Sequence, residues 1–124
     1  MEPLVGFAAA NGRGVYRPTG VASAGQAADM ISAVLDLAQA GGLTTVLVDI
    51  TGLTGFEIPG PAFRRWAVRR WATAAADLRV AMVARPERIC PEKTGLLIAA
   101  EEGMHAHICA SKAEAIAWLD ARQP

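Results

Sequence analysis

The residues best suited to binding chemistry lie in an arginine-rich stretch, FRRWAVRRW, at residues 63–71. It holds four arginines and no acidic residue to pair with them. In an α-helix, which advances about 100° per residue, Arg65 and Arg69 lie together on one side. The opposite, apolar stripe consists of Phe63, Ala67, Trp71 and Ala74, and it leaves Trp66 outside. Guanidinium groups bind oxyanions through paired hydrogen bonds, and an exposed indole adds apolar contact area.

Two interpretations of this helix stay open. As a binding surface formed by Phe63, Arg65, Trp66 and Arg69, it would receive an acidic protein partner, a phosphate or a lipid headgroup at a membrane surface. As a solvated helix face, its arginines would instead pair with acids from neighbouring elements, such as Glu57 or Asp77. The charge pattern alone fits both.

The loop before this helix carries apolar side chains where solvent normally favours polar ones. Phe56 and Ile58 stand there among glycines and prolines. Because glycines around an apolar segment suit a lid over a nonpolar ligand, we predict that Phe56 and Ile58 line a pocket for a small apolar or anionic ligand. The alternative is that Phe56 only closes the end of the core.

A cysteine is the next group that could do chemistry. Cys90 precedes Pro91 at an expected helix start, with Arg85 and Arg88 close in sequence, and such surroundings favour the reactive thiolate. However, no histidine stands nearby in the sequence to act as its base. A free cysteine is also commonly a small buried apolar residue. We therefore assign Cys90 no catalytic role.

Two histidines, His105 and His107, alternate along an expected strand, so their side chains share a face and could hold a metal together. Two ligands do not make a site, although Asp49 and Glu57 are carboxylates that could complete one. We favour two packed or partly exposed histidines and predict no metal site.

Motifs of the common enzyme classes are absent from the sequence. It has no GxGxxG turn, no phosphate loop ending in Gly-Lys-Ser/Thr, no HExxH and no GxSxG. The adjacent acids Glu101 and Glu102 stand at an expected helix end, where exposure to solvent is more common than acid–base work. We therefore predict no catalytic residue and no cofactor.

The elements that must position these residues alternate between strands and helices. Asn11-Gly12 predicts a tight β-hairpin, and capping-box patterns at Ser23/Gln26 and Ser111/Glu114 predict helix starts. Apolar, β-branched runs predict strands covered on both faces. The expected strands are 5–10, 14–17, 45–50, 78–84 and 104–109, and the expected helices are 23–41, 62–76, 91–103 and 112–121.

This order, ββαβαβαβα, predicts an α/β fold. Strands separated by helices must cross over, and right-handed crossovers give parallel strands with helices on the faces of the sheet. We therefore predict a mostly parallel five-stranded sheet with an N-terminal hairpin, formed by residues 1–124 as one domain.

Composition narrows the class of partner. The 124 residues include 12 basic and 12 acidic side chains, so no net field attracts nucleic acid. The sequence starts without a basic signal-peptide region, and no apolar run reaches the ~20 residues of a membrane span. We expect a cytoplasmic protein with reduced cysteines and no transmembrane segment.

With these elements in place, the pattern resembles the STAS-like (SpoIIAA-like) superfamily, named for sulfate transporters and anti-sigma-factor antagonists, and within it a bacterial branch of small cytoplasmic domains. The hairpin and the first helix ending in Gly41-Gly42 carry part of the resemblance. Three segments carry the rest: VLVDITGLTG at 46–55, RVAMVA at 79–84 and EAIAWL at 114–119. The resemblance covers most of the chain and implies a STAS-like sheet.

In anti-sigma antagonists, a phosphorylatable serine lies in an Asp-Ser-Ser-Gly turn just before the second helix. One alignment places Thr51 at that serine. The other, which we favour, places Ile58-Pro59-Gly60 there. Because proline has no hydroxyl group, the second alignment implies that the phosphoswitch is absent.

These observations predict a non-enzymatic binding or regulatory module for a protein partner or a small apolar or anionic ligand. One alternative is a small enzyme that depends on the thiol of Cys90 or on a metal held by His105 and His107. Another is a self-association module in which Trp66 packs against a second copy, and we expect a homodimer.

Overall fold

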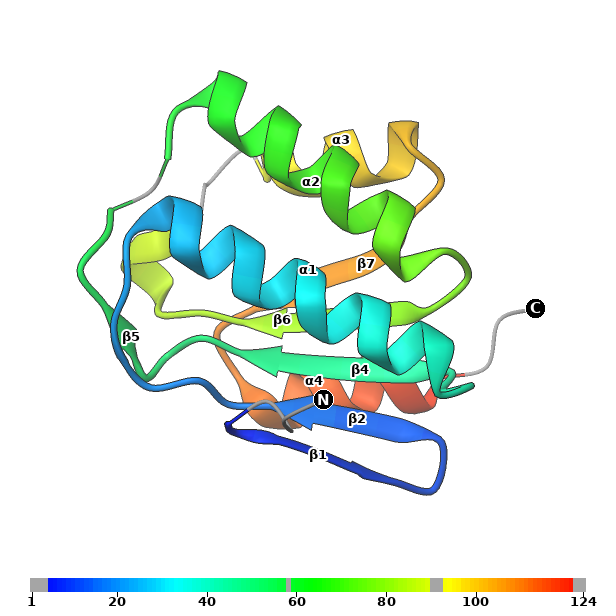
Figure 1. The fold of residues 1–124 in the computed structure, drawn as a ribbon. Coiled ribbons are helices and arrows are strands. Elements are labelled where there is room, and N and C mark those ends of the chain that lie inside the picture. The colour runs from blue at the N-terminus through cyan, green and yellow to red at the C-terminus, as the bar shows by residue number, and fades with distance from the viewer. Residues whose placement is uncertain (1–4, 58, 90–92, 122–124) are drawn as a thin grey trace.

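Figure 1 shows the protein in a computed structural model, which describes residues 5–57, 59–89 and 93–121. The main sheet is built from β1 (Phe7–Ala10), β2 (Arg13–Tyr16), β4 (Thr45–Asp49), β6 (Arg79–Val83) and β7 (His105–Cys109). The helices are α1 (Ala24–Ala40), α2 (Pro61–Ala75), α3 (Thr94–Glu101) and α4 (Lys112–Asp120). Helices α1, α2 and α3 cover one face of this sheet, and α4 covers the other.

The predicted α/β class is confirmed, and the sheet is mixed. Its strands follow the order β1-β2-β4-β6-β7. The hairpin strands β1 and β2 are antiparallel, whereas β2–β4, β4–β6 and β6–β7 are parallel pairs. The predicted N-terminal hairpin adds an antiparallel edge to the strands joined by helical crossovers, so the sheet as a whole is mixed.

The local signals at the N-terminal half gave the expected structures. Asn11 and Gly12 both have positive φ, 54° and 77°, as the tight hairpin turn requires. At the start of α1, the Ser23 hydroxyl accepts from the amide of Gln26 at 3.1 Å, and the Ser23 amide donates to the Gln26 side chain at 2.8 Å. The predicted capping box is therefore confirmed. Gly42, with φ 74°, follows the last turn of α1.

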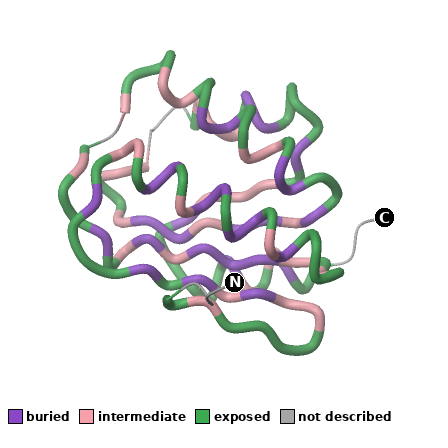
Figure 2. The backbone as a smooth tube through the Cα atoms, in the orientation of Figure 1, coloured by how far each residue is buried: buried purple, intermediate pink, exposed green. Residues whose placement is uncertain are grey.

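The central strands are buried on both faces, as Figure 2 shows for β4 and β6. Along β4, Val46 and Val48 pack toward α1, while Leu47 packs toward α4. Side chains alternate across a strand, so a sheet covered on both sides needs apolar residues at every position. This requirement explains the continuous apolar runs in the sequence.

A second, two-stranded sheet was not predicted. It pairs β3 (Gly20–Val21) with β5 (Leu53–Thr54) in parallel. Gly55, with φ 101°, follows β5, and a Cβ atom there would lie 2.9 Å from the carbonyl oxygen of Ala22. Only glycine fits this close approach. This small sheet ties the loop before α2 to the start of α1.

The C-terminal half follows the predicted order with small differences. Helix α3 begins at Thr94 in the described part of the chain, and the expected start at Pro91 lies outside it. A short 3-10 helix, Pro86–Arg88, follows β6 and was not predicted. None of the helices that the structure describes is long and apolar enough to cross a membrane.

Candidate functional site

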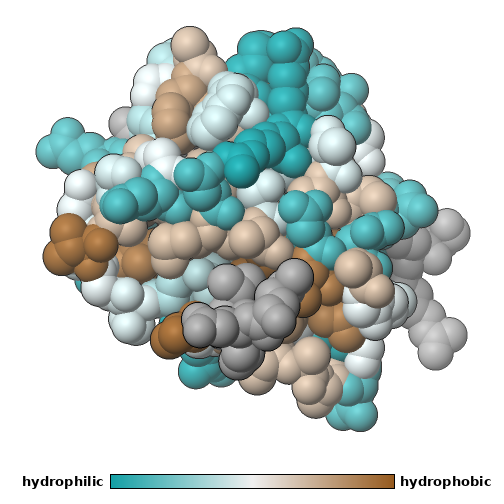
Figure 3. Space-filling model, in the orientation of Figure 1, coloured by the Kyte–Doolittle hydropathy of each residue, from teal (hydrophilic) through white to brown (hydrophobic). Residues whose placement is uncertain are grey.

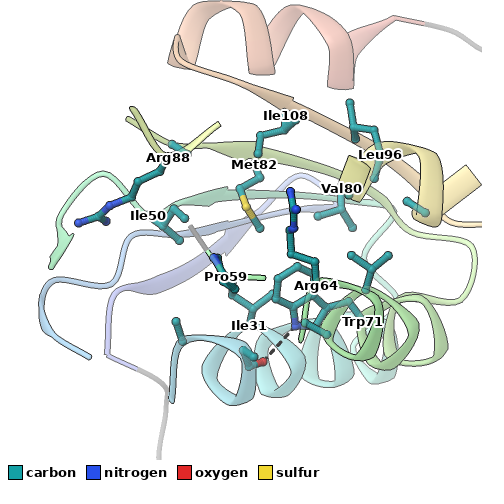
Figure 4. Close-up of a pocket in the computed structure, with 18 of the residues that line it drawn as sticks. Ile31, Ile50, Pro59, Arg64, Trp71, Val80, Met82, Arg88, Leu96 and Ile108 are labelled. Atoms are coloured by element: carbon teal, nitrogen blue, oxygen red, sulfur yellow. Dashed lines mark hydrogen bonds between the residues drawn. The ribbon is translucent and has the colours of Figure 1, made fainter. Parts of the chain in front are cut away.

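A cavity of about 180 Å³ lies between the sheet and the three helices α1, α2 and α3. Figure 4 shows residues from all of these elements around it. Its floor is formed by side chains of β6 and β7 that alternate away from α4: Val80, Met82, Ala106 and Ile108. The packing on this face therefore leaves a hollow where a small molecule could fit.

The walls of the cavity are almost wholly apolar. They come from α1, from the loop before α2, and from α2 and α3. These walls include Ala28, Ile31, Leu35, Ile50, Phe56, Pro59, Phe63, Ala67, Val68, Trp71, Leu96 and Ala99. An apolar cavity of this kind excludes water unless polar groups are present to bind it.

Arg64 is one of the charged exceptions to this apolar lining. Its side chain extends from α2 toward Met82 and Val80 of β6 (Figure 4). Two guanidinium nitrogens, Nε and Nη1, are buried, and neither has a hydrogen-bond partner in the described part of the chain. Buried donors without partners are costly because they lose hydration and gain no hydrogen bond in return.

Two further cations, Arg88 and Lys93, line the cavity, and none of the described lining residues is acidic. Arg88 already donates to the carbonyl oxygen of Leu53 at 2.6 Å and lies 4.5 Å from the centroid of the Phe56 ring. These contacts hold Phe56 in the wall. The charged groups described in the lining are therefore all basic, and Arg64 is the one with buried donors that have no described partner.

Trp71 fixes the two helices that form the upper wall. Its indole N–H donates to the carbonyl oxygen of Ala28 in α1 at 3.0 Å, as the dashed line in Figure 4 shows. The ring beneath this hydrogen bond lines the cavity. The indole thus joins α1 to α2 and keeps the hollow open between them.

The position of Arg64 follows from helical periodicity. Arg64, Val68 and Trp71 stand at positions i, i+4 and i+7 of α2, which share one face. The sequence prediction missed Arg64 because the apolar stripe was drawn through Phe63, and arginines were assigned to the solvent side. Its spacing from Val68 and Trp71 is the signal that could have found it.

The other arginines of α2 lie on its outer side, where Figure 3 shows hydrophilic side chains gathered at the top of the view. Arg65 pairs with Glu101 at 3.4 Å and Arg69 with Glu102 at 3.8 Å, both at the end of α3. Arg70 pairs with Asp29 of α1. The acids therefore come from α3 and α1, and neither Glu57 nor Asp77 appears in these pairs.

The predicted binding residues thus separate into two groups. Phe56 and Phe63 line the cavity, whereas Arg65, Trp66 and Arg69 are exposed on the far side of α2. Trp66 is 48 % exposed and packs on Phe63, with ring centroids 5.3 Å apart. Ile58 lies outside the described residues. The outer surface of α2 as a partner site stays a prediction.

The histidine and cysteine predictions have different outcomes. Cys90 lies outside the described residues. His105 is exposed, whereas His107 faces Glu114 and comes close to Cys109. The prediction considered neither Cys109 nor Glu114 as a partner of His107. Their position was hinted at by the Ser111/Glu114 pattern, which places Glu114 in the first turn of α4, directly after β7.

The structure also places the two candidate phosphosite turns. Pro59 and Gly60 directly precede α2, whereas Thr51 lies in the turn after β4. The Thr51 hydroxyl donates to a carboxylate oxygen of Asp49 at 2.6 Å. Which of these two turns corresponds to the serine turn of the anti-sigma antagonists stays a prediction.

Sequence comparison does not assign the chain to a family. No protein-family model matches the chain, and no curated protein is significantly similar to it. The resemblance to the STAS-like superfamily therefore stays a prediction that rests on the motifs quoted above.

Proposed function

We propose that this protein is a binding module for a small organic anion with an apolar body, held in the cavity with its carboxylate against Arg64. The observation that carries the proposal is the pair of buried, unpartnered guanidinium nitrogens in an otherwise apolar hollow. This function stands beside the expected protein-partner role of the outer α2 surface, where no buried, unpartnered donor is found among the described residues.

The charge of Arg64 selects the sign of the ligand. Arginine stays protonated in proteins, so the group cannot escape the cost of burial by losing a proton. A carboxylate would accept hydrogen bonds from the guanidinium, and charge-assisted bonds of this kind are about twice as strong as neutral ones. Because the described lining has no acid, a cationic ligand would meet only repulsion.

The size of the cavity limits the apolar part of the ligand. A dry, apolar cavity of about 150 Å³ in another protein binds benzene. The cavity here, at about 180 Å³, leaves room for an apolar body of benzene size and a carboxylate beside it. Hexanoate is a suitable probe, with hexan-1-ol and hexylamine as matched molecules of nearly the same length.

Isothermal titration calorimetry at fixed ionic strength tests the proposal. We expect hexanoate to bind at least tenfold more tightly than hexan-1-ol, since hydrogen bonds to charged groups contribute about 1.5–3 kcal/mol. Hexylamine should not bind. Arg64→Met should weaken hexanoate at least tenfold and leave hexan-1-ol unchanged, because methionine keeps the apolar contact and loses the charge.

Arg65→Met is the matched control, because Arg65 is the next residue on the same helix and points outward to Glu101. It should leave both affinities unchanged. Equal affinity of wild-type protein for hexanoate and hexan-1-ol would contradict the proposal. So would an Arg64→Met variant that binds hexanoate as wild type does.

A further inference from the structure

Three side chains that can bind metals converge on the opposite face of the sheet, where β7 leads into α4. They are His107 and Cys109 of β7 and Glu114 of α4. One ligand atom from each lies within 4.8 Å of the other two. His107 Nε2 and a Glu114 carboxylate oxygen are 2.9 Å apart. His107 also belongs to the lining of the cavity, whereas Cys109 and Glu114 do not, and Arg64 is not part of this corner.

Local structure brings the three groups together. His107 and Cys109 are two residues apart on β7, so their side chains lie on the same face of the sheet. The Ser111 hydroxyl caps α4 by accepting from the amide of Glu114 at 3.2 Å. The return hydrogen bond of the predicted capping box is not among the described contacts, and the Glu114 carboxylate is directed to His107 instead. Half of the predicted box is thus replaced by the contact with His107.

The imidazole of His107 is also held in place by packing. It stacks on the Trp118 ring, with the two centroids 5.4 Å apart and the planes at 13°. Cys109 is buried, and its thiol lies 3.2 Å from the carbonyl oxygen of Ser111. Two of the three groups are therefore fixed before any ion binds, which reduces the entropy lost on binding.

We propose that this corner is a Zn²⁺ site, with His107 Nε2, the Cys109 thiolate and the Glu114 carboxylate as ligands. Nitrogen, sulfur and carboxylate oxygen are the ligand types of zinc in proteins, at about 2.0–2.3 Å from the ion. Ligand atoms around such an ion lie closer together than 4.8 Å, so these side chains must move closer together when the ion binds.

The proton and charge balances are simple. Binding breaks the S–H bond of Cys109 and forms a bond from sulfur to zinc, and the thiol proton leaves to solvent. Thiolate and carboxylate together neutralise the two positive charges of the ion. The side chains of His107 and Glu114 are 24 % and 59 % exposed, so the fourth coordination position faces water. The thiolate selects zinc or cobalt over magnesium or calcium, which prefer oxygen ligands.

Titration of the chelator-treated full chain with Co²⁺ tests the site, since cobalt replaces zinc and reports its ligands by absorption. We expect a thiolate-to-cobalt charge-transfer band in the near ultraviolet and d–d bands of tetrahedral intensity. Zn²⁺ should displace the cobalt, and Mg²⁺ should not. Glu114→Gln and His107→Gln should each weaken Co²⁺ at least tenfold, as even changes outside the ligand shell cost 10–100-fold.

Matched controls use the other cysteine and the other histidine. Cys109→Ser should abolish the charge-transfer band, whereas Cys90→Ser and His105→Gln should keep it. If Cys109→Ser does not fold, Glu114→Gln still decides, because Glu114 is exposed. The proposal is overturned if the band follows Cys90, if no thiolate band appears, or if Glu114→Gln and His107→Gln bind Co²⁺ as wild type does.

Discussion

Two arginines on opposite faces of the sheet both have buried donors without partners, but their surroundings differ. Arg64 and Arg79 each have buried Nε and Nη1 atoms without a hydrogen-bond partner. Arg79, on the α4 side, lies 4.1 Å from the centroid of the Trp118 ring and donates from Nη2 to the Trp118 carbonyl oxygen at 2.5 Å. No such contact with an aromatic ring or acceptor is described for Arg64, which extends into the cavity.

The comparison shows that unpaired donors alone do not identify a binding site. The aromatic face of Trp118 partly compensates the Arg79 cation, since an indole ring attracts cations through its quadrupole. Arg79 therefore joins β6 to α4 and serves the fold. Arg64 has a hollow before it and no such compensation, so its charge is available to a ligand.

The packing on the two faces of the sheet also differs, with the face of Arg79 closed and the face of Arg64 open. The α4 face is closed by small and branched residues, including Leu47, Ala81, Val83, Ala115 and Leu119. On the other face, the same sheet meets three helices that do not close completely over Met82 and Ile108. The closed face is filled by side chains, whereas the open face contains the cavity.

The largest expected effect comes from adding volume to each face. Ala115 of α4 and Ala99 of α3 are both buried helical alanines that face the sheet. Ala115→Leu should lower the free energy of unfolding by about 3 kcal/mol, the upper end of overpacking costs in a filled core. Ala99→Leu should cost less than about 0.5 kcal/mol, because the new side chain enters the cavity.

Urea denaturation measures both free energies, and calorimetry with hexanoate shows whether Ala99→Leu has filled the site. We expect binding to be lost in Ala99→Leu. Equal destabilisation by the two substitutions would contradict the contrast between an open and a closed face.

The next largest effect should separate the two arginines by the sign of the change. Arg79→Met should lower the free energy of unfolding by about 2 kcal/mol, because it removes a charge-assisted hydrogen bond and a cation–π contact. Arg64→Met should raise it by about 1 kcal/mol, because it removes the desolvation cost of unpaired donors.

Thermal and urea unfolding without added ligand give both values. The sign of the Arg64 effect is the informative result. If both substitutions destabilised the protein equally, Arg64 would be a structural residue like Arg79, and its unpaired nitrogens would not point to a ligand.

The sequence predicted the elements of this fold better than its site. Hairpin turn, helix caps and buried strands each depend on local signals, such as Asn11-Gly12 or Ser23 with Gln26, and these were correct within about one or two residues. Strands β3 and β5 were missed because two residues carry no period, and their pairing depends on a contact between distant parts of the chain.

The candidate site is formed by contacts between several elements, and the residue pattern of a single helix does not predict such contacts. Phe56, expected at a pocket from its apolar type in a loop, lies in the cavity wall, and its role in binding stays a prediction; Arg64 was overlooked in favour of its neighbours. The acids that pair with Arg65 and Arg69 come from α3, about 35 residues later in the chain. Charge balance across helices becomes visible only once the helices are packed.

The smallest expected effect concerns the outer surface of α2. Replacing Arg65 and Arg69 with Glu breaks two exposed ion pairs, each of which contributes between about 0 and 1 kcal/mol, and sets like charges opposite Glu101 and Glu102. We expect a loss of unfolding free energy of at most about 1 kcal/mol. Hexanoate affinity should stay within twofold of wild type, because neither side chain lines the cavity.

Light scattering on the same double variant tests whether the outer side of α2 joins two copies of the chain. If the outer side of α2 joined two copies of the chain, reversing the charge of Arg65 and Arg69 would dissociate them. Acidic side chains of the second copy would then no longer be attracted to this surface. If wild-type protein is a dimer in this measurement, and the double variant is a monomer that still binds hexanoate, the two sides of α2 have separate roles: Arg64 serves the ligand, and Arg65 and Arg69 serve association. A joint loss of both would instead couple the surface to the cavity, and the contrast between the inward and outward arginines would have to be abandoned.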